Sequence, residues 1–345
     1  MHKKTAFVVL ALAATLLARP AAADAVADFY KGKTLTVVVG FPPGGLNDIS
    51  ARLVARHIVK YLPGAPRSLV QNMPGAGGLT STNFLYNIAP KDGTTIGGIL
   101  RSIPQTAYLG DPNIRFDPAK FLWLGSTSSF ADDAYALFIM ASRPITSWED
   151  LKRPGKRLMI GAVGVDIKLT FSLFTKEALG LNVDITHGYQ GTAQLFLAMQ
   201  NGEIDGQFNS LSSTKAAQSA LWRDKQFRVL VQYGRATRHA ELPDAPTGRE
   251  IVTNPEDLAL LTFVEAPLYM SLPFAAPPGV PAERIAALRA AFDQAHKDPE
   301  FLAEAARSEL DVSPINGDQV AKLVDDMSKV PPAVVEKFKT ISTLR

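Results

Sequence analysis

Strand-like runs alternate with helix-like runs through most of this sequence of 345 residues, and this alternation restricts the fold more than any other feature. The apolar run 35–39 (LTVVV) precedes residues 47–62, where apolar side chains recur near helical spacing. A second strand-like run at 67–71 is again followed by helix-like sequence, and 93–100 has the character of a third strand. Such an order is typical of βαβ units. The sequence therefore predicts an α/β fold with largely parallel sheets.

The N-terminal residues have the pattern of a secretory signal peptide. Lys3 and Lys4 precede the apolar run 6–18, and small residues that fit the A-x-A cleavage form follow it. We expect a signal peptide over 1–25, with cleavage near Ala23 or Ala25. No later segment reaches the roughly 18 consecutive apolar residues of a membrane helix, so we expect the exported chain to carry no membrane anchor.

Two domains are expected, because the roughly 320 residues left after cleavage exceed the usual size of one compact core. The alternation resumes after Gly125, and the segment LPDAPTGRE beyond the last strand-like run is irregular and rich in proline, as a crossing back to the first domain would be. The sequence predicts a discontinuous first lobe at 26–124 and 240–345, and a second lobe at 125–239.

Charge and cysteine content exclude several classes of protein. The sequence holds 36 basic and 33 acidic residues, and cleavage after Ala23 removes Lys3, Lys4 and Arg19, which leaves 33 of each sign. A chain without excess positive charge is a poor nucleic-acid partner, and none is expected. The sequence contains no cysteine. Disulfides, thiol chemistry and a lipid-bearing cysteine are therefore excluded.

The stretch FPPGGLND (41–48) lies between the first strand and the first helix. Gly44 and Gly45 lack a Cβ and can let a ligand approach the main chain, and Asn47 or Asp48 can cap the helix. The first amides of a helix have no internal partner and lie at the positive end of its dipole, which suits a carboxylate or a phosphate. A tight strand-to-helix turn with an ordinary cap explains the same residues, and this loop alone favours that simpler interpretation.

A second glycine-rich loop, NMPGAGG (72–78), shifts the balance towards anion binding. It again follows a strand-like run and precedes a helix, and the hydroxyls of Thr80, Ser81 and Thr82 come next. Loops at the carboxyl ends of neighbouring parallel strands face one crevice, where ligands bind in open α/β sheets. Arg101 follows the third strand and should lie on the same edge. It can clamp a second carboxylate, or it can be a surface residue beside Ser102.

Other chemistries have little support in the sequence. Neither loop has the lysine and hydroxyl of a P-loop, and GAGGLT lacks the third glycine of a dinucleotide site. The histidines that remain after cleavage are widely separated, and His57 is expected on the surface of a helix. There is no G-x-S-x-G elbow. We therefore expect no metal, no cofactor and no enzymatic activity.

Seven stretches together resemble the substrate-binding proteins of tripartite tricarboxylate transporters, also called Bug proteins, of the bacterial periplasm. In order they are FPPGGLND, NMPGAGG, PKDGTTIG, ITSWEDL, HGYQG, LPDAPTGRE and APPGVP. Each stretch alone is a weak signal, but the ordered set is specific and covers nearly the whole mature chain.

The resemblance implies a periplasmic-binding-protein fold of type II, the Venus-flytrap arrangement of two α/β lobes with a hinge and a ligand cleft between them. It also implies a monomer that captures a small organic carboxylate and delivers it to the large and small membrane subunits of a transporter. A periplasmic sensor for a signalling receptor is an alternative function. A secreted α/β enzyme acting on a carboxylate or phosphate is a further alternative.

The resemblance also implies a set of ligand-binding residues. The first lobe would hold a carboxylate through main-chain amides of its two loops. Arg101 and Ser102 are candidates because they follow the third strand, on the same edge as the loops. The full set is Phe41, Pro43, Gly44, Gly45, Asp48, Pro74, Gly75, Ala76, Gly77, Gly78, Arg101, Ser102, Gly164, Asp166, Tyr189, Gly191 and Asp205. Ser81, Lys91 and Gly188 depart from the family pattern. The identity of the carboxylate therefore stays open.

Overall fold

The computed structural model describes residues 25–163, 167–189, 191–308 and 310–343. Residues 1–24 of the expected signal peptide, Gly164 and Asp166 lie outside these ranges. The chain forms two compact units, each described here by itself. Unit 1 contains the described residues up to Ile103, Asp111–Thr127 and Leu272–Lys322, and unit 2 contains Pro104–Gly110, Ser128–Ser271 and the residues from Leu323 onward.

This division differs from the lobes predicted from the sequence. The second unit extends to Ser271 instead of residue 239, and it includes the C-terminal residues. Helix α10 (Pro255–Glu265) accounts for the difference, because it packs against α14 (Pro332–Thr343). An ion pair of 2.7 Å between Lys337 Nζ and Asp257 Oδ1 joins the two helices.

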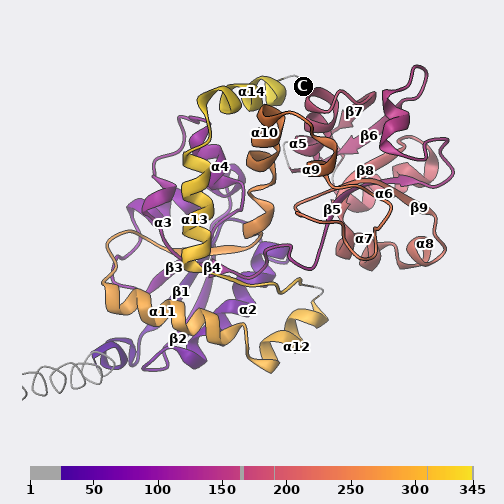
Figure 1. Cartoon of the computed structure of the whole chain (residues 1–345). Coiled ribbons are helices and arrows are strands. Elements are labelled where there is room, and N and C mark those ends of the chain that lie inside the picture. The colour runs from indigo at the N-terminus through magenta and orange to yellow at the C-terminus, as the bar shows by residue number, and fades with distance from the viewer. Residues whose placement is uncertain (1–24, 164–166, 190, 309, 344–345) are drawn as a thin grey trace, which may run out of the picture. The chain divides into compact units, whose positions relative to one another are not determined.

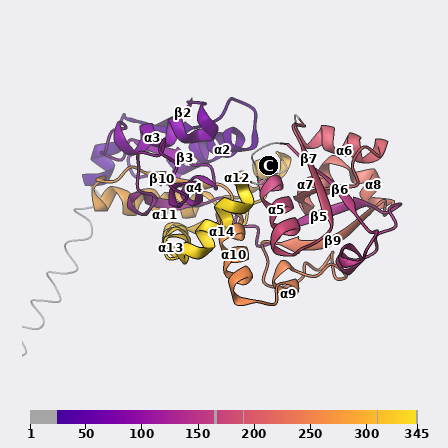
Figure 2. The same ribbon diagram turned by 90° about the horizontal axis from the view of Figure 1, so that it is seen from above.

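Unit 1 is built on a six-stranded mixed sheet with the order β11-β4-β10-β3-β1-β2. Strand β1 pairs in parallel with both β2 and β3, whereas β10 runs antiparallel between β3 and β4. Figure 2 shows β10 next to β3. The prediction of parallel strands is confirmed for β1, β2 and β3, and it is wrong for the other three strands of this sheet. The strands are β1 (Thr34–Val39), β2 (Arg67–Asn72), β3 (Thr95–Gly98), β4 (Leu122–Ser126), β10 (Pro273–Ala276) and β11 (Ile315–Asn316).

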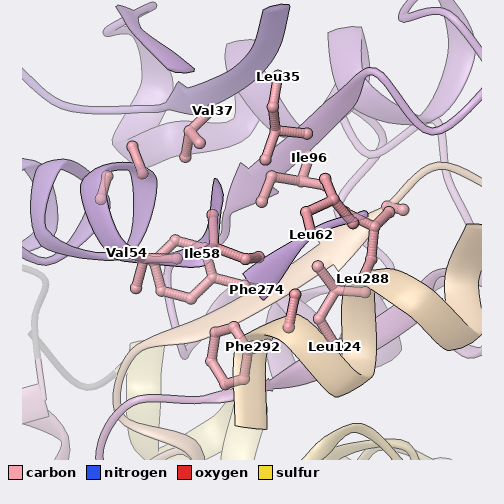
Figure 3. Packing of buried hydrophobic residues seen from close by; sticks show 14 of the residues in the cluster. Leu35, Val37, Val54, Ile58, Leu62, Ile96, Leu124, Phe274, Leu288 and Phe292 are labelled. Carbon is pink, nitrogen blue, oxygen red and sulfur yellow. The ribbon is translucent and has the colours of Figure 1, made fainter. Parts of the chain in front are cut away.

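Helices cover this sheet through regularly spaced apolar residues. In α2 (Leu46–Tyr61) the buried residues Ala51, Val54 and Ile58 lie on one face, at helical spacing. Figure 3 shows Val54 and Ile58 packed near Phe274 of β10 and Phe292 of α11. Burial of each such large apolar side chain stabilises the fold by about 1.5–3 kcal/mol. The other helices here are α3 (Leu79–Asn87), α11 (Ala282–Ala295) and α12 (Pro299–Arg307), while α4 (Ile103–Tyr108) and α13 (Gly317–Ser328) span the boundaries of the division.

Unit 2 has a five-stranded mixed sheet with the order β7-β6-β8-β5-β9. Strand β6 is parallel to β7 and β8, and β5 is antiparallel to β8 and β9. Figures 1 and 2 show helices α5 to α8 beside these strands. The strands are β5 (Tyr135–Met140), β6 (Leu158–Ala162), β7 (Val183–His187), β8 (Gly206–Ser210) and β9 (Phe227–Tyr233). The helices are α5 (Ile167–Leu173), α6 (Thr192–Asn201), α7 (Leu211–Ala217), α8 (Ser219–Arg223) and α9 (Gly248–Ile251).

Aromatic rings fill the centre of unit 2. The rings of Phe171 and Tyr233 stack with centroids 4.6 Å apart, and Phe208 packs against both. These three side chains are fully buried. Within the described ranges, none of the helices has both the length and the apolar character that crossing a membrane requires.

Candidate functional site

Loop 1 (residues 41–45) joins β1 to the N-terminus of α2. The helix begins at Leu46, so its N-cap is Gly45, and the predicted caps Asn47 and Asp48 lie within the helix. Gly44 has a φ of +93°, which favours glycine, and a Cβ on Gly45 would meet nothing within 4 Å. The loop therefore leaves open space over the first turn of α2, where amides lack partners in the helix.

Loop 2 (residues 73–78) has an unusual run of backbone conformations. Gly75, Ala76, Gly77 and Gly78 have φ values of +143°, +45°, +62° and +92°. Ala76 adopts the left-handed region despite its Cβ, at a cost of about 1–2 kcal/mol. The Gly78 amide donates to Gly75 O at 3.0 Å, which closes residues 75–78 into a tight turn. A Cβ on Gly77 would meet nothing within 4 Å, so the space beside loop 2 is open there.

The two loops lie against each other, as expected for neighbouring parallel strands. The ends of β1 and β2 are in register, with Val39 opposite Asn72. A Cβ built on Gly40 would lie 2.7 Å from Gly78 Cα, and the Phe41 ring comes within 3.6 Å of the Cβ position of Gly78. This contact confirms the predicted juxtaposition of the loops, and it requires glycine at position 40.

The segment after β3 borders the same place. Ile103 Cδ1 and Leu100 Cβ lie 3.4 and 3.8 Å from the Cβ position of Gly78. Arg101 and Ser102, which lie between these two residues, are half-buried. The edge of unit 1 thus brings together loop 1, loop 2 and the predicted residues 101 and 102.

Asp48 has a different environment from the one expected of a ligand-binding residue. Only 2% of its surface is exposed, and its Oδ2 accepts hydrogen bonds from the Gly44 amide at 2.8 Å and Arg52 Nε at 2.9 Å. Its Oδ1 accepts a bond of 2.8 Å from Asn72 Nδ2. Burial acts to raise the pKa of Asp48, but the hydrogen bonds from Arg52, Asn72 and Gly44 outweigh it and hold the pKa below its usual value. The carboxylate is ionised and engaged within the protein.

The predicted residues of unit 2 fall at two different edges of its sheet. Tyr189 follows β7 and is half-buried, and Gly191 is the N-cap of α6, where a Cβ would meet nothing within 4 Å. Asp205 instead precedes β8, beside the start of β6. Its Oδ2 accepts a bond of 2.6 Å from the Met159 amide, and Arg143 Nε lies 2.9 Å from its Oδ1. The structure therefore separates Asp205 from Tyr189 and Gly191.

Lys168 is a buried cation that the sequence pattern did not predict. It lies in α5 with only 6% of its surface exposed, and its Nζ donates to Phe208 O at 2.6 Å and Asn209 Oδ1 at 2.9 Å. These acceptors lie towards the carboxyl end of β8. Buried lysines are rare. The only signal in the sequence was a lysine between Ile167 and Leu169.

One cluster in unit 1 has the composition of a metal site, but Lys60 occupies it. Ligand atoms of His57, Asp298 and Glu300 all lie within 4.8 Å of one another. Lys60 Nζ lies 3.1 Å from His57 Nδ1, 3.1 Å from Asp298 Oδ2 and 2.6 Å from Glu300 Oε2. The ammonium group thus takes the position that a metal ion would need.

The prediction that His57 lies on a helix surface is wrong. Its exposed fraction is 4%, because α12 covers this part of α2. Its Nδ1 lies 3.1 Å from Asp298 Oδ2, and its Nε2 lies 3.0 Å from Glu304 Oε2. A depression of about 510 Å³ beside it is lined by Arg56, Lys60, Glu300, Ala303, Glu304 and Arg307.

Comparisons with known proteins agree on one family. Residues 50–339 match the family described as "Tripartite tricarboxylate transporter family receptor". A curated Cupriavidus necator protein, "UPF0065 protein in gbd 5'region", is 27% identical over 333 residues, which cover 94% of this chain and 92% of that protein. A second UPF0065 protein, from Bordetella pertussis, is 26% identical over 340 residues, which cover 96% of this chain and 97% of that protein.

Solved structures of similar proteins show the same two-lobe fold. A TctC solute binding protein from Polaromonas aligns with a TM-score of 0.68 at 17% identity, over 90% of this chain and 98% of that one. MatC from Rhodopseudomonas palustris with bound malate aligns at 0.57 and 19% identity, over 90% and 99%. Another R. palustris protein, solved with adipate, aligns at 0.61 and 19% identity, over 90% and 97%. Because these sequence identities are below 25%, the similarity to the solved structures supports the same fold and no more.

Proposed function

Because the chain belongs to the tripartite tricarboxylate transporter receptor family, we propose that it captures a small organic carboxylate in the periplasm and delivers it to a tripartite tricarboxylate-type transporter. The family consists of solute-binding proteins, and we propose no catalytic role for this member. Its proposed partners are the carboxylate and the large and small membrane subunits of the transporter, with the receptor acting as a monomer.

The juxtaposition of loops 1 and 2 is the observation that supports this function most strongly. The tight turn at Gly75–Gly78 lies against loop 1, which leads into the N-terminus of α2. That helix N-terminus offers main-chain amides and a positive electrostatic potential to an anion. A carboxylate fits because its two oxygen atoms can accept bonds from separate amides. We therefore propose that Phe41, Pro43, Gly44, Gly45 and residues Pro74–Gly78 line the carboxylate site. The Gly44 amide, which donates to Asp48, would shape the site and not bind the ligand.

Residues outside the two loops would determine which carboxylate binds. Arg101 and Ser102 border loop 2 and are our candidates for contacts with the rest of the ligand in unit 1. In unit 2 we propose Gly164, Asp166, Tyr189 and Gly191. Asp205 has a structural role instead, because the Met159 amide and Arg143 engage both of its oxygen atoms.

Two of the similar structures suggest the first ligands to test, since they were solved with malate and adipate, which are both dicarboxylates. The mature protein would be screened by thermal denaturation against these two acids and a set of monocarboxylates, aromatic acids and amino acids. A ligand present at 100 times its Kd should add about 2.7 kcal/mol of stability. Stabilisation by a carboxylate, with the acid recovered unchanged by NMR, would support the proposal. Absence of stabilisation across the library, or turnover of the bound acid, would contradict it.

A further inference from the structure

We propose that Asp48, Arg52 and Asn72 form a brace that positions loop 1 and cancels a negative charge next to the carboxylate site. This inference rests on the proposed function, because it concerns how the site tolerates an anionic ligand. It also changes the role of Asp48, from a residue that contacts the ligand to one that acts through loop 1. Arg52 and Asn72 were not among the residues predicted from the sequence.

The hydrogen bonds of the brace connect three parts of the fold. Asp48 Oδ2 accepts from the Gly44 amide at 2.8 Å, which fixes loop 1 to the first turn of its own helix. Asn72 is the last residue of β2, immediately before loop 2. Its Nδ2 donates to Phe41 O at 2.8 Å and to Asp48 Oδ1 at 2.8 Å. Asn72 therefore ties the start of loop 2 to both the main chain of loop 1 and helix α2.

Arg52 completes the brace from the next turn of α2. Its Nε donates to Asp48 Oδ2 at 2.9 Å, and its Nη2 donates to Asn72 Oδ1 at 3.0 Å. The guanidinium group thus holds the side chains of Asp48 and Asn72 in a single orientation. It is 40% exposed, whereas Asp48 is buried.

Asp48 lies where its negative charge would oppose an anionic ligand. A buried carboxylate in the first turn of α2 lies close to the amides that would receive the ligand, and like charges repel strongly where water is scarce. Protonation of Asp48 would remove this repulsion, but its hydrogen bonds keep the carboxylate ionised. Arg52 supplies the compensating positive charge. Such a partly exposed pair contributes little to global stability, so its main effect should be on ligand affinity.

The test compares the single variant R52Q with the double variant D48N/R52Q. For the carboxylate that stabilises the wild type most, with adipate as the first probe, R52Q should bind on the order of tenfold more weakly by calorimetry. D48N/R52Q should regain part of that affinity, because the uncharged side chain at position 48 needs no cation and its oxygen can still accept from the Gly44 amide. The recovery is partial because the Nδ2 at position 48 then faces Asn72 Nδ2, which is also a donor. R56Q is the matched control. Arg56 lies one turn further along α2, is 51% exposed and pairs with Glu304, so this variant should bind as the wild type does.

Two results would overturn the brace. Wild-type affinity in R52Q would show that the charge of Asp48 needs no compensation. No recovery of affinity in D48N/R52Q relative to R52Q would show that Arg52 does not act by compensating the charge of Asp48. Thermal denaturation of the ligand-free variants shows whether each is folded.

A second readout separates failure of the brace from failure of the proposed function. If the wild type binds no carboxylate, the proposed function fails, while the brace is still tested by NMR without ligand. The Gly44 amide resonance should follow the ionisation of Asp48, and its titration should move to higher pH in R52Q but not in R56Q. An unchanged titration in R52Q would overturn the brace.

Discussion

His57 Nδ1 on α2 lies 3.1 Å from Asp298 Oδ2 at the N-cap of α12, although the two residues are 241 positions apart. The other ring nitrogen of His57 faces Glu304 Oε2 at 3.0 Å, so the imidazole lies between two carboxylates of the same helix. The hydrogen bond from His57, with further bonds from the Glu300 amide and Lys60, holds the pKa of Asp298 well below its usual value. This contact fastens α12 to α2.

We predict that Asp298→Asn makes the protein less stable at pH 7 and that the difference becomes smaller in acid. A carboxylate whose pKa is lowered by folding stabilises the native state above its unfolded pKa of about 3.9, and this contribution is lost as the pH falls through the folded pKa. Thermal denaturation of the wild type and the variant at pH 7, 5 and 3 would measure this contribution to stability. Glu300→Gln is the control, because Glu300 binds the same Lys60 but is 79% exposed. A deficit in Asp298→Asn that is equally large at pH 3 would contradict the prediction.

Gly45→Trp should abolish stabilisation by a carboxylate without unfolding the protein. Gly45 has a φ of −85°, and a Cβ there meets nothing within 4 Å, so a side chain can be added without a clash. The indole would then fill the open space over the first turn of α2. Gly45→Ala is the matched control and should retain most of the binding. Calorimetry with the best ligand of the screen measures both, and unchanged binding by the tryptophan variant would disprove the amide site.

Gly40→Ala should both destabilise unit 1 and weaken binding. The new Cβ would lie 2.5 Å from Ser81 Oγ and 2.7 Å from Gly78 Cα. We expect a loss of about 1–3 kcal/mol, typical of overpacking. Removing the hydroxyl in Gly40→Ala/Ser81→Ala should recover only part of the loss, because the contact with Gly78 is to main chain. Urea denaturation provides the measurement, and full recovery in the double variant would show that the loops are not in backbone contact.

Arg249→Ala should cost more stability at high pH than at low pH. Glu265 is fully buried, and its carboxylate accepts bonds from Arg249 Nη2 at 2.7 Å, the Gly234 amide at 2.9 Å and the Tyr269 hydroxyl at 3.0 Å. Burial raises the pKa of Glu265, and Arg249 opposes that rise. Without Arg249 the folded pKa rises further.

A carboxyl whose folded pKa is raised loses stabilisation as the pH increases through that value. We therefore expect Arg249→Ala to lose about 2 kcal/mol at pH 8 and less at pH 5 in urea denaturation. Arg238→Ala is the control, since Arg238 and Glu250 form an exposed pair worth less than about 1 kcal/mol. An equal loss at both pH values would show that Arg249 acts through packing alone.

Local sequence patterns were enough to predict the first strands and helices of unit 1. The run LTVVV forms most of β1, and the near-helical spacing of Ile49, Leu53 and Ile58 predicted a helix over 47–62, in agreement with α2. Strand β10 could not be predicted in the same way. Its four residues, Pro273–Ala276, carry no distinctive period, and their antiparallel pairing depends on β3 and β4, which come much earlier in the chain.

The same distinction applies to the candidate site. The glycines of loops 1 and 2 were identifiable because conformations with positive φ and close main-chain contacts require glycine. The environments of Asp48 and His57 could not be identified from the sequence, because their partners Asn72, Asp298 and Glu304 belong to other elements. Only the fold reveals that such side chains are already engaged.

Strand β10 also has a consequence for how the chain folds. Strands β3 and β4 do not pair with each other, because residues 273–276 lie between them in the sheet. Until that late segment is available, both strands have open edges, which are templates for association with other chains. Contacts so distant in sequence also make folding slow. Unit 1 can thus complete its sheet only after most of the chain has been synthesised, a delay that suits a protein proposed to cross a membrane before it folds.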